Sequence, residues 1–291
     1  MCDNHSIDDM IEFTRRSGEL TRRRFSALSL GSSLAMMLPR AADAAEVVES
    51  EVDIKTADGT ADAYFVHPKG GAHPGVLIWP DAFGLRPAFK QMAKRLAESG
   101  YSVLVPNPFY RTKRTPVFPE GANFQDEATR KVIMATMATL NPETHVTDAK
   151  AFVTFLDSQP SVDKKRKMGT TGYCMGGPMT VRTAATFPDR IGAGGSFHGG
   201  GLVTDKPDSP HLLIPKLKAQ YLFAIAENDD QKQPEAKDVL REAFAKAKLS
   251  AEIEVYPAMH GWCPPDSAVY KEDQAEKAWG RLLVLFKKAL V

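Results

Sequence analysis

The 291-residue chain contains only three cysteines, Cys2, Cys174 and Cys263. Three residues spaced this widely give neither a disulfide framework nor the paired CxxC pattern of a structural zinc site. An excess of charge of one sign is also lacking, because 37 lysines and arginines are balanced by 36 aspartates and glutamates, which leaves a formal net charge of +1. A balance this even does not favour binding to nucleic acid or to an anionic membrane.

The first 44 residues differ in composition from the rest. Three arginines at 22–24 precede Phe25, an uncharged and modestly apolar run follows at 26–39, and Ala42-Asp43-Ala44 forms a small-residue A-x-A site. This succession predicts a twin-arginine (Tat) signal peptide at 1–44 that engages the Tat export machinery and delivers a mature protein to the periplasm or the medium. The run is too short and too rich in serine and glycine for a permanent membrane anchor. A basic amphipathic helix is the alternative.

Residues 45–291 contain no internal repeat and no long linker, and therefore predict one domain. Strand-like and helix-like segments alternate, which indicates an α/β fold with a mostly parallel central sheet covered by helices on both faces. Two antiparallel edge strands are expected at 47–55 and 61–67, around the turn signal Asp58-Gly59. The other expected strands are 75–79, 101–105, 167–171, 191–197, 219–226 and 251–256, and the expected helices are 87–99, 125–140, 142–156, 178–187, 234–247 and 266–290.

The stretch most suggestive of chemistry is Gly172-Tyr173-Cys174-Met175-Gly176, which follows the strand expected at 167–171. A nucleophile on a sharp strand-to-helix turn sits in strained backbone, so small residues are needed two positions before it and two after it. Cys174 would then project above the sheet, at the N-terminus of a helix that favours a thiolate. A glycine-rich turn with a buried cysteine is the alternative interpretation of the motif alone.

Polar residues follow three further strands, at the edge where the carboxyl ends of parallel strands meet. Asp81 follows the strand at 75–79, Glu227-Asn228-Asp229-Asp230 follows 219–226, and His260 follows 251–256. The order nucleophile, acid, histidine is the one that an α/β-hydrolase requires. A histidine must take the proton of the thiol and a carboxylate must orient that histidine. Asp229 fits the orienting role best, with Asp230 in reserve.

The sequence resembles the dienelactone hydrolase family over residues 52–286. The resemblance is carried by the stretches PDAFGL at 80–85, VPNPFYR at 105–111, GYCMGG at 172–177 and HGW at 260–262. It implies an α/β-hydrolase fold, a Cys174-Asp229-His260 catalytic triad and hydrolysis of a small ester or lactone, of the carboxymethylenebutenolidase type. No metal and no organic cofactor is implied.

Further roles follow for single residues. Backbone N–H groups of Ala82 and Met175 are expected to form the oxyanion hole. By the resemblance, Asp81 replaces a family glutamate that modulates the cysteine, and Arg111 matches an arginine that binds the substrate carboxylate. A second family arginine is missing, because Cys263-Pro264-Pro265 stands in its place.

The last expectations concern the pocket. Phe83 and Trp262 are expected as its walls. His198 begins an HGGG sequence, but this lies downstream of the nucleophile rather than upstream, so His198 is expected to line the pocket or to pack under a loop. Cys263 is expected to be a structural thiol. Two alternatives stay open: a general carboxylesterase, and a ligand-binding or thiol-redox protein that keeps the fold without hydrolysis.

Overall fold

The computed structural model describes residues 11–12 and 44–291. The predicted signal peptide at 1–44 therefore falls almost wholly outside the described residues, and so does Cys2.

In the described part of the chain, eight strands form one sheet in the order β1-β2-β4-β3-β5-β6-β7-β8. The β1–β2 hairpin is antiparallel and β2 runs antiparallel to β4, whereas every pairing from β4 to β8 is parallel. The strands are β1 Val47–Thr56, β2 Gly59–Pro68, β3 Gly75–Trp79, β4 Ser102–Pro106, β5 Met168–Tyr173, β6 Ile191–Phe197, β7 Gln220–Ala226 and β8 Ala251–Tyr256. The parallel strands carry their carboxyl ends to one edge of the sheet, which gathers the loops that follow them.

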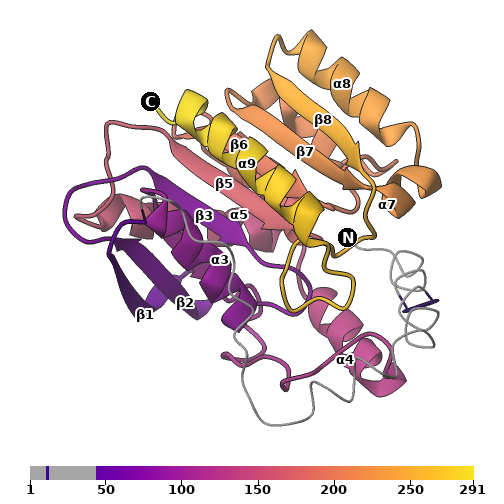
Figure 1. Cartoon of the computed structure of the whole chain (residues 1–291), viewed down its shortest axis with the longest axis horizontal. Coiled ribbons are helices and arrows are strands. Elements are labelled where there is room, and N and C mark those ends of the chain that lie inside the picture. The colour runs from indigo at the N-terminus through magenta and orange to yellow at the C-terminus, as the bar shows by residue number, and fades with distance from the viewer. Residues whose placement is uncertain (1–10, 13–43) are drawn as a thin grey trace.

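Helices cover both faces of this sheet (Figure 1). They are α3 Pro87–Glu98, α4 Glu127–Met137, α5 Pro142–Ser158, α6 Gly176–Thr186, the 3-10 helix η1 Pro210–Lys216, α7 Glu227–Lys232, α8 Ala236–Lys246 and α9 Glu272–Ala289. Alternate side chains of β3 enter opposite cores: Val76 and Ile78 pack with residues of α3 and α9, and Leu77 and Trp79 pack with residues of α5, α6 and α8. No helix among the described residues is both long and apolar enough to span a membrane.

The architecture confirms the predicted α/β-hydrolase fold, with two local differences. The helix expected at 266–290 begins at Glu272, because residues 264–270 form turns that project Asp266 toward Arg86. The stretch 227–230, expected as a loop, belongs to the short helix α7. Its three acidic residues lie in the first turn, where the helix dipole favours negative charge.

Candidate active site

The predicted site residues meet at the carboxyl edge of the parallel strands, around a cavity of about 1470 Å³. Cys174 follows β5, His198 follows β6 and His260 follows β8, and all three line the cavity. Asp81, Ala82 and Phe83, which follow β3, line it as well. The half-buried Ile11 also reaches the cavity wall, although it belongs to the predicted signal segment.

The β5–α6 turn holds Cys174 in a strained conformation. Its φ of 54° lies in the left-handed region, which a non-glycine residue adopts at an energetic cost. A Cβ at Gly172 would come within 2.1 Å of the Gly176 carbonyl oxygen, and one at Gly176 within 2.3 Å of the Trp79 carbonyl oxygen. The spacing of the motif is thus a steric requirement, since no side chain fits at either glycine.

His198 supports the same turn from β6. The Cys174 N–H donates to both the Phe197 carbonyl oxygen and the His198 Nδ1, each at 3.1 Å. Burial, with His260 beside it, lowers the pKa of His198 well below its ordinary value. A neutral ring is what allows Nδ1 to accept this hydrogen bond, which leaves the proton on Nε2. The two imidazole rings lie edge to face with centroids 5.1 Å apart.

His260 is oriented by α7. Its Nδ1 lies 2.7 Å from Asp229 Oδ2, and its backbone N–H donates to Asn228 Oδ1 at 2.8 Å. Asp230 instead accepts from Lys237 Nζ at 2.6 Å. Of the two aspartates left open by the sequence, it is therefore Asp229 that contacts the histidine. Asp229 does not itself line the cavity, so it acts on the cavity through His260.

Two backbone N–H groups are available near Cys174. Ala82 is buried in the turn after β3, and Met175 occupies the N-cap position of α6. Within the described residues, neither N–H donates a hydrogen bond to a protein acceptor. Unsatisfied N–H groups at a helix N-terminus and an adjacent turn can stabilise negative charge that develops on an oxygen.

Asp81 lies at the cavity but is engaged by a cation. Arg86 donates from Nη1 to Asp81 Oδ1 at 2.6 Å and from Nη2 to Asp81 Oδ2 at 2.9 Å. The same guanidinium donates to Asp266 at 2.6 and 3.0 Å. Burial alone would lower the pKa of Arg86, but the two carboxylates outweigh it and raise that pKa. Arg86 therefore joins the loop after β3 to the loop after His260.

Arg111 is placed elsewhere. It donates to both oxygens of Asp148, at 2.9 and 2.6 Å, and to Asp58. Burial raises the pKa of Asp148, and Arg111 and Tyr110 offset part of that rise. Arg111 is not among the described residues that line the cavity. The structure thus does not bring it to Cys174, and its guanidinium serves as counter-ion of a buried carboxylate.

Of the two expected wall residues and the second thiol, one lines the cavity and two do not. Phe83 lines the cavity, whereas Trp262 is fully buried behind it, stacked on Tyr256 with centroids 4.9 Å apart. Cys263 is a free, buried thiol outside the cavity lining, and burial raises its pKa.

Sequence reasoning missed two polar residues of this region, Arg86 and Asn228. Arg86 is a charged residue immediately before the first turn of a helix, where the dipole disfavours a cation, and this position was a usable signal for a carboxylate partner. Asn228 is the buried residue of an otherwise acidic turn. Within the residues that the structure describes, no group of three or more histidine, cysteine or acidic side chains is arranged to hold a metal ion.

Comparison with known proteins identifies the family and supports the fold. The profile of the dienelactone hydrolase family matches residues 61–290. A Methylorubrum extorquens protein provisionally named carboxymethylenebutenolidase is 31% identical, over 92% of this chain and 93% of its own. The crystal structure of a Klebsiella pneumoniae protein provisionally described as a dienelactone hydrolase superposes with a TM-score of 0.72 at 24% identity, covering 84% of this chain and 99% of that one. A dienelactone hydrolase-like promiscuous phosphotriesterase from metagenomic libraries gives a TM-score of 0.68 at 22% identity, with the same coverage.

Two glycine-to-alanine changes, one in the β5–α6 turn and one in α9, should change the free energy of unfolding in opposite directions. Gly176→Ala should lower the free energy of unfolding by at least about 2 kcal/mol, because the new methyl group overlaps the Trp79 carbonyl. Gly280→Ala, at an exposed site in α9 with nothing within 4 Å, should raise it by about 0.5–1 kcal/mol. Urea denaturation measures both. An unchanged stability for Gly176→Ala would contradict the close packing of the turn.

Proposed function

Because the chain belongs to the dienelactone hydrolase family, with a match over residues 61–290, we propose that it hydrolyses a carboxylic ester or lactone by covalent catalysis at Cys174. The observation that carries this proposal is the Asp229–His260 hydrogen bond of 2.7 Å at the edge of the sheet where Cys174 sits in a strained turn. Cys174 and His260 line one cavity, so a bound substrate can meet both.

The proposed reaction has two halves. His260 takes the proton of the Cys174 thiol, and the thiolate attacks the ester carbonyl carbon while the N–H groups of Ala82 and Met175 stabilise the oxyanion. The tetrahedral intermediate collapses to a thioester as the alcohol leaves with the proton from His260. Water, deprotonated by His260, then attacks the thioester, and the acid departs as Cys174 leaves as thiolate. Asp229 holds the imidazole in the tautomer that accepts the thiol proton.

One second candidate is a thiol-redox protein with the same fold, because Cys174 lines the cavity beside the N-terminus of α6, which favours a thiolate. Oxidised sulfur cannot act as the nucleophile, so the hydrolytic proposal requires Cys174 as a free thiol. Cys263 gives the redox candidate little support, because it is buried away from the cavity.

The two aspartates of α7 give a matched test of the triad. In the reduced protein, Cys174→Ala should abolish ester turnover with thermal unfolding nearly unchanged. Asp229→Asn should lower kcat by roughly 10²- to 10⁴-fold, because the imidazole loses its orienting carboxylate. Asp230→Asn removes only the contact with Lys237 and should change kcat less than about threefold. Retained turnover in Cys174→Ala, or equal losses in both aspartate variants, would refute these assignments.

Activity should depend on a free thiol at Cys174. Hydrolysis of a p-nitrophenyl ester by protein kept in dithiothreitol should be abolished once the reductant is removed and iodoacetamide is added. Peptide mass spectrometry should place the alkyl group on Cys174 and spare Cys263, whose burial raises its pKa. Equal rates before and after alkylation would argue against a Cys174 nucleophile. Reversible oxidation of Cys174 without ester turnover would favour the redox candidate.

We also propose export by the Tat machinery, with a mature domain of 45–291 in the periplasm or outside the cell. The support is the arginine triplet at 22–24 and the A-x-A site at 42–44. Replacement of Arg22, Arg23 and Arg24 by lysine should retain the full-length chain in the cytoplasm, as judged by fractionation and N-terminal sequencing. Recovery of an uncleaved wild-type chain from the cytoplasm would contradict this assignment.

A further inference from the structure

We propose that the cavity selects bulky, uncharged esters with an aromatic or long aliphatic group and disfavours substrates that carry a carboxylate. This inference rests on the hydrolase activity proposed above and specifies its substrate class. It departs from the carboxylate-binding role that the sequence resemblance implies for Arg111.

One wall of the cavity is aromatic. Phe83, Phe118 and Phe124 all line it, with ring centroids of Phe83 and Phe124 4.9 Å apart and of Phe83 and Phe118 6.5 Å apart, both edge to face. These rings belong to or pack against the same apolar cluster as Cys174 and Met175. An aromatic wall beside the nucleophile can hold a ring or alkyl chain while the ester carbonyl lies at Cys174.

The cavity is large, and an aliphatic side chain already contacts its apolar surface. Its volume of about 1470 Å³ exceeds the roughly 300–1,000 Å³ of ordinary ligand pockets. Ile11 lines it, half-buried, and packs against the apolar cluster of the wall. The volume therefore accommodates a substrate larger than a five-membered lactone.

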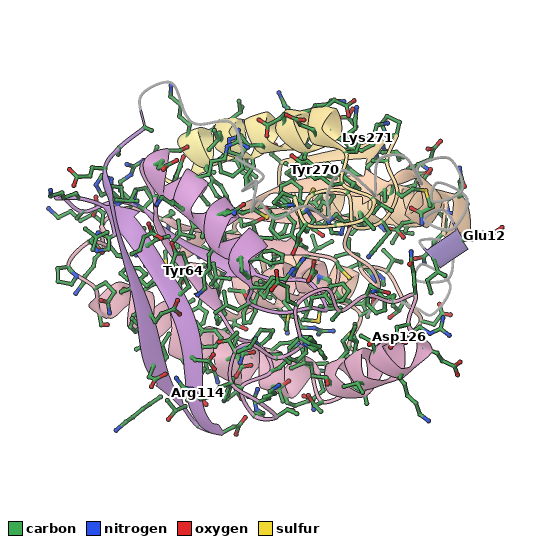
Figure 2. All side chains as sticks on the ribbon, turned by 60° about the horizontal axis from the view of Figure 1, so that its bottom comes forward. Glu12, Tyr64, Arg114, Asp126, Tyr270 and Lys271 are labelled. Atoms are coloured by element: carbon green, nitrogen blue, oxygen red, sulfur yellow. The ribbon has the colours of Figure 1, made fainter. Side chains whose placement is uncertain are left out.

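Each cationic side chain in the lining is paired with a carboxylate that also lines the cavity. Arg86 contacts Asp81 and Asp266, and Lys90 contacts Glu51. Arg114, visible near the end of the β1–β2 hairpin in Figure 2, contacts Asp53. The described lining holds six carboxylates against these three cations: Glu51, Asp53, Asp62, Asp81, Glu120 and Asp266. A carboxylate on the substrate would meet an excess of like charge.

Asp62, one of these six carboxylates, is held in a fixed position by hydrogen bonds. It is a buried carboxylate that accepts hydrogen bonds from the hydroxyl and the backbone N–H of Thr115 and from Asn107. Burial would raise its pKa, but these hydrogen bonds, led by that of the Thr115 hydroxyl, outweigh burial and lower it. Asp62 therefore stays charged near neutral pH. Arg111, the cation expected to bind a substrate carboxylate, is committed to Asp148 outside the lining.

Two esters of one shape test the preference for charge. Dimethyl terephthalate is uncharged, whereas monomethyl terephthalate carries a carboxylate at the far end of the same ring. After normalisation to their rates of alkaline hydrolysis and to the number of ester groups, kcat/KM should be at least about tenfold higher for the diester. An equal or higher value for the monoester would overturn the proposal.

Binding of the same two compounds to Cys174→Ala separates this inference from the proposed function. Calorimetric titration should give a lower Kd for the diester than for the monoester even though this variant does not turn over. If the wild type hydrolyses neither ester while this order of Kd holds, the proposed function fails and the cavity assignment survives. Tighter binding of the monoester would refute the cavity assignment whatever the activity.

Two pairs of variants locate the cause. Asp266→Asn removes one of the carboxylates on Arg86 and should reduce the preference for the diester, whereas Asp238→Asn, in an exposed ion pair with Arg241, should not. Phe118→Ala should raise KM for the diester more than for methyl acetate. Phe155→Ala, an aromatic deletion beside Phe65 outside the cavity lining, should leave that ratio unchanged. Equal effects within each pair would mean that the lining does not set the preference.

Discussion

The close approach of the β5–α6 turn to the end of β3 fixes the geometry of the site. Gly176 packs so near the Trp79 carbonyl that no side chain fits between them, and this contact holds Cys174 at its positive φ. Ala82 follows Trp79 by three residues and Met175 directly precedes Gly176. The same contact therefore fixes the position of the Ala82 N–H relative to the Met175 N–H. The proposed nucleophile and the proposed oxyanion donors are thus positioned by backbone packing rather than by flexible side chains, which is the preorganisation that catalysis of acyl transfer requires.

A second connection joins two loops that line the cavity. Arg86 binds Asp81 on the loop after β3 and Asp266 on the loop that follows His260. Helix α7 also fixes the loop that carries His260. Asn228 accepts a hydrogen bond from the His260 backbone N–H, and the neighbouring Asp229 contacts the His260 ring. Asp81 therefore acts in the structure as an anchor for Arg86. Arg86 and Asp81 are largely buried whereas Asp266 is exposed, so loss of Asp81 would be poorly tolerated because it would remove the buried partner of Arg86.

The fold could be predicted because its signals are local: apolar runs for the buried strands, helical spacing between them, and glycines at the elbow. The order of Cys174, Asp229 and His260 followed from strand-end position alone. The partners of the arginines could not be predicted. Arg86 meets Asp266 across 180 positions and Arg111 meets Asp148 across 37, and such contacts depend on loop paths that no local pattern encodes. Trp262 was expected at the cavity because it follows His260, yet it turns inward onto Tyr256.

The VPNPFYR stretch illustrates how a family motif can stabilise the fold without contacting the substrate. Asn107 donates to Asp62 and accepts from the Phe109 N–H, so it shapes the turn after β4. Arg111 neutralises the buried Asp148 from α5. Both contacts stabilise the domain whether or not the ligand carries a charge. A retained motif arginine is therefore no argument for a carboxylate substrate here, and the charge of the cavity lining becomes the physical basis on which the substrate class has to be inferred.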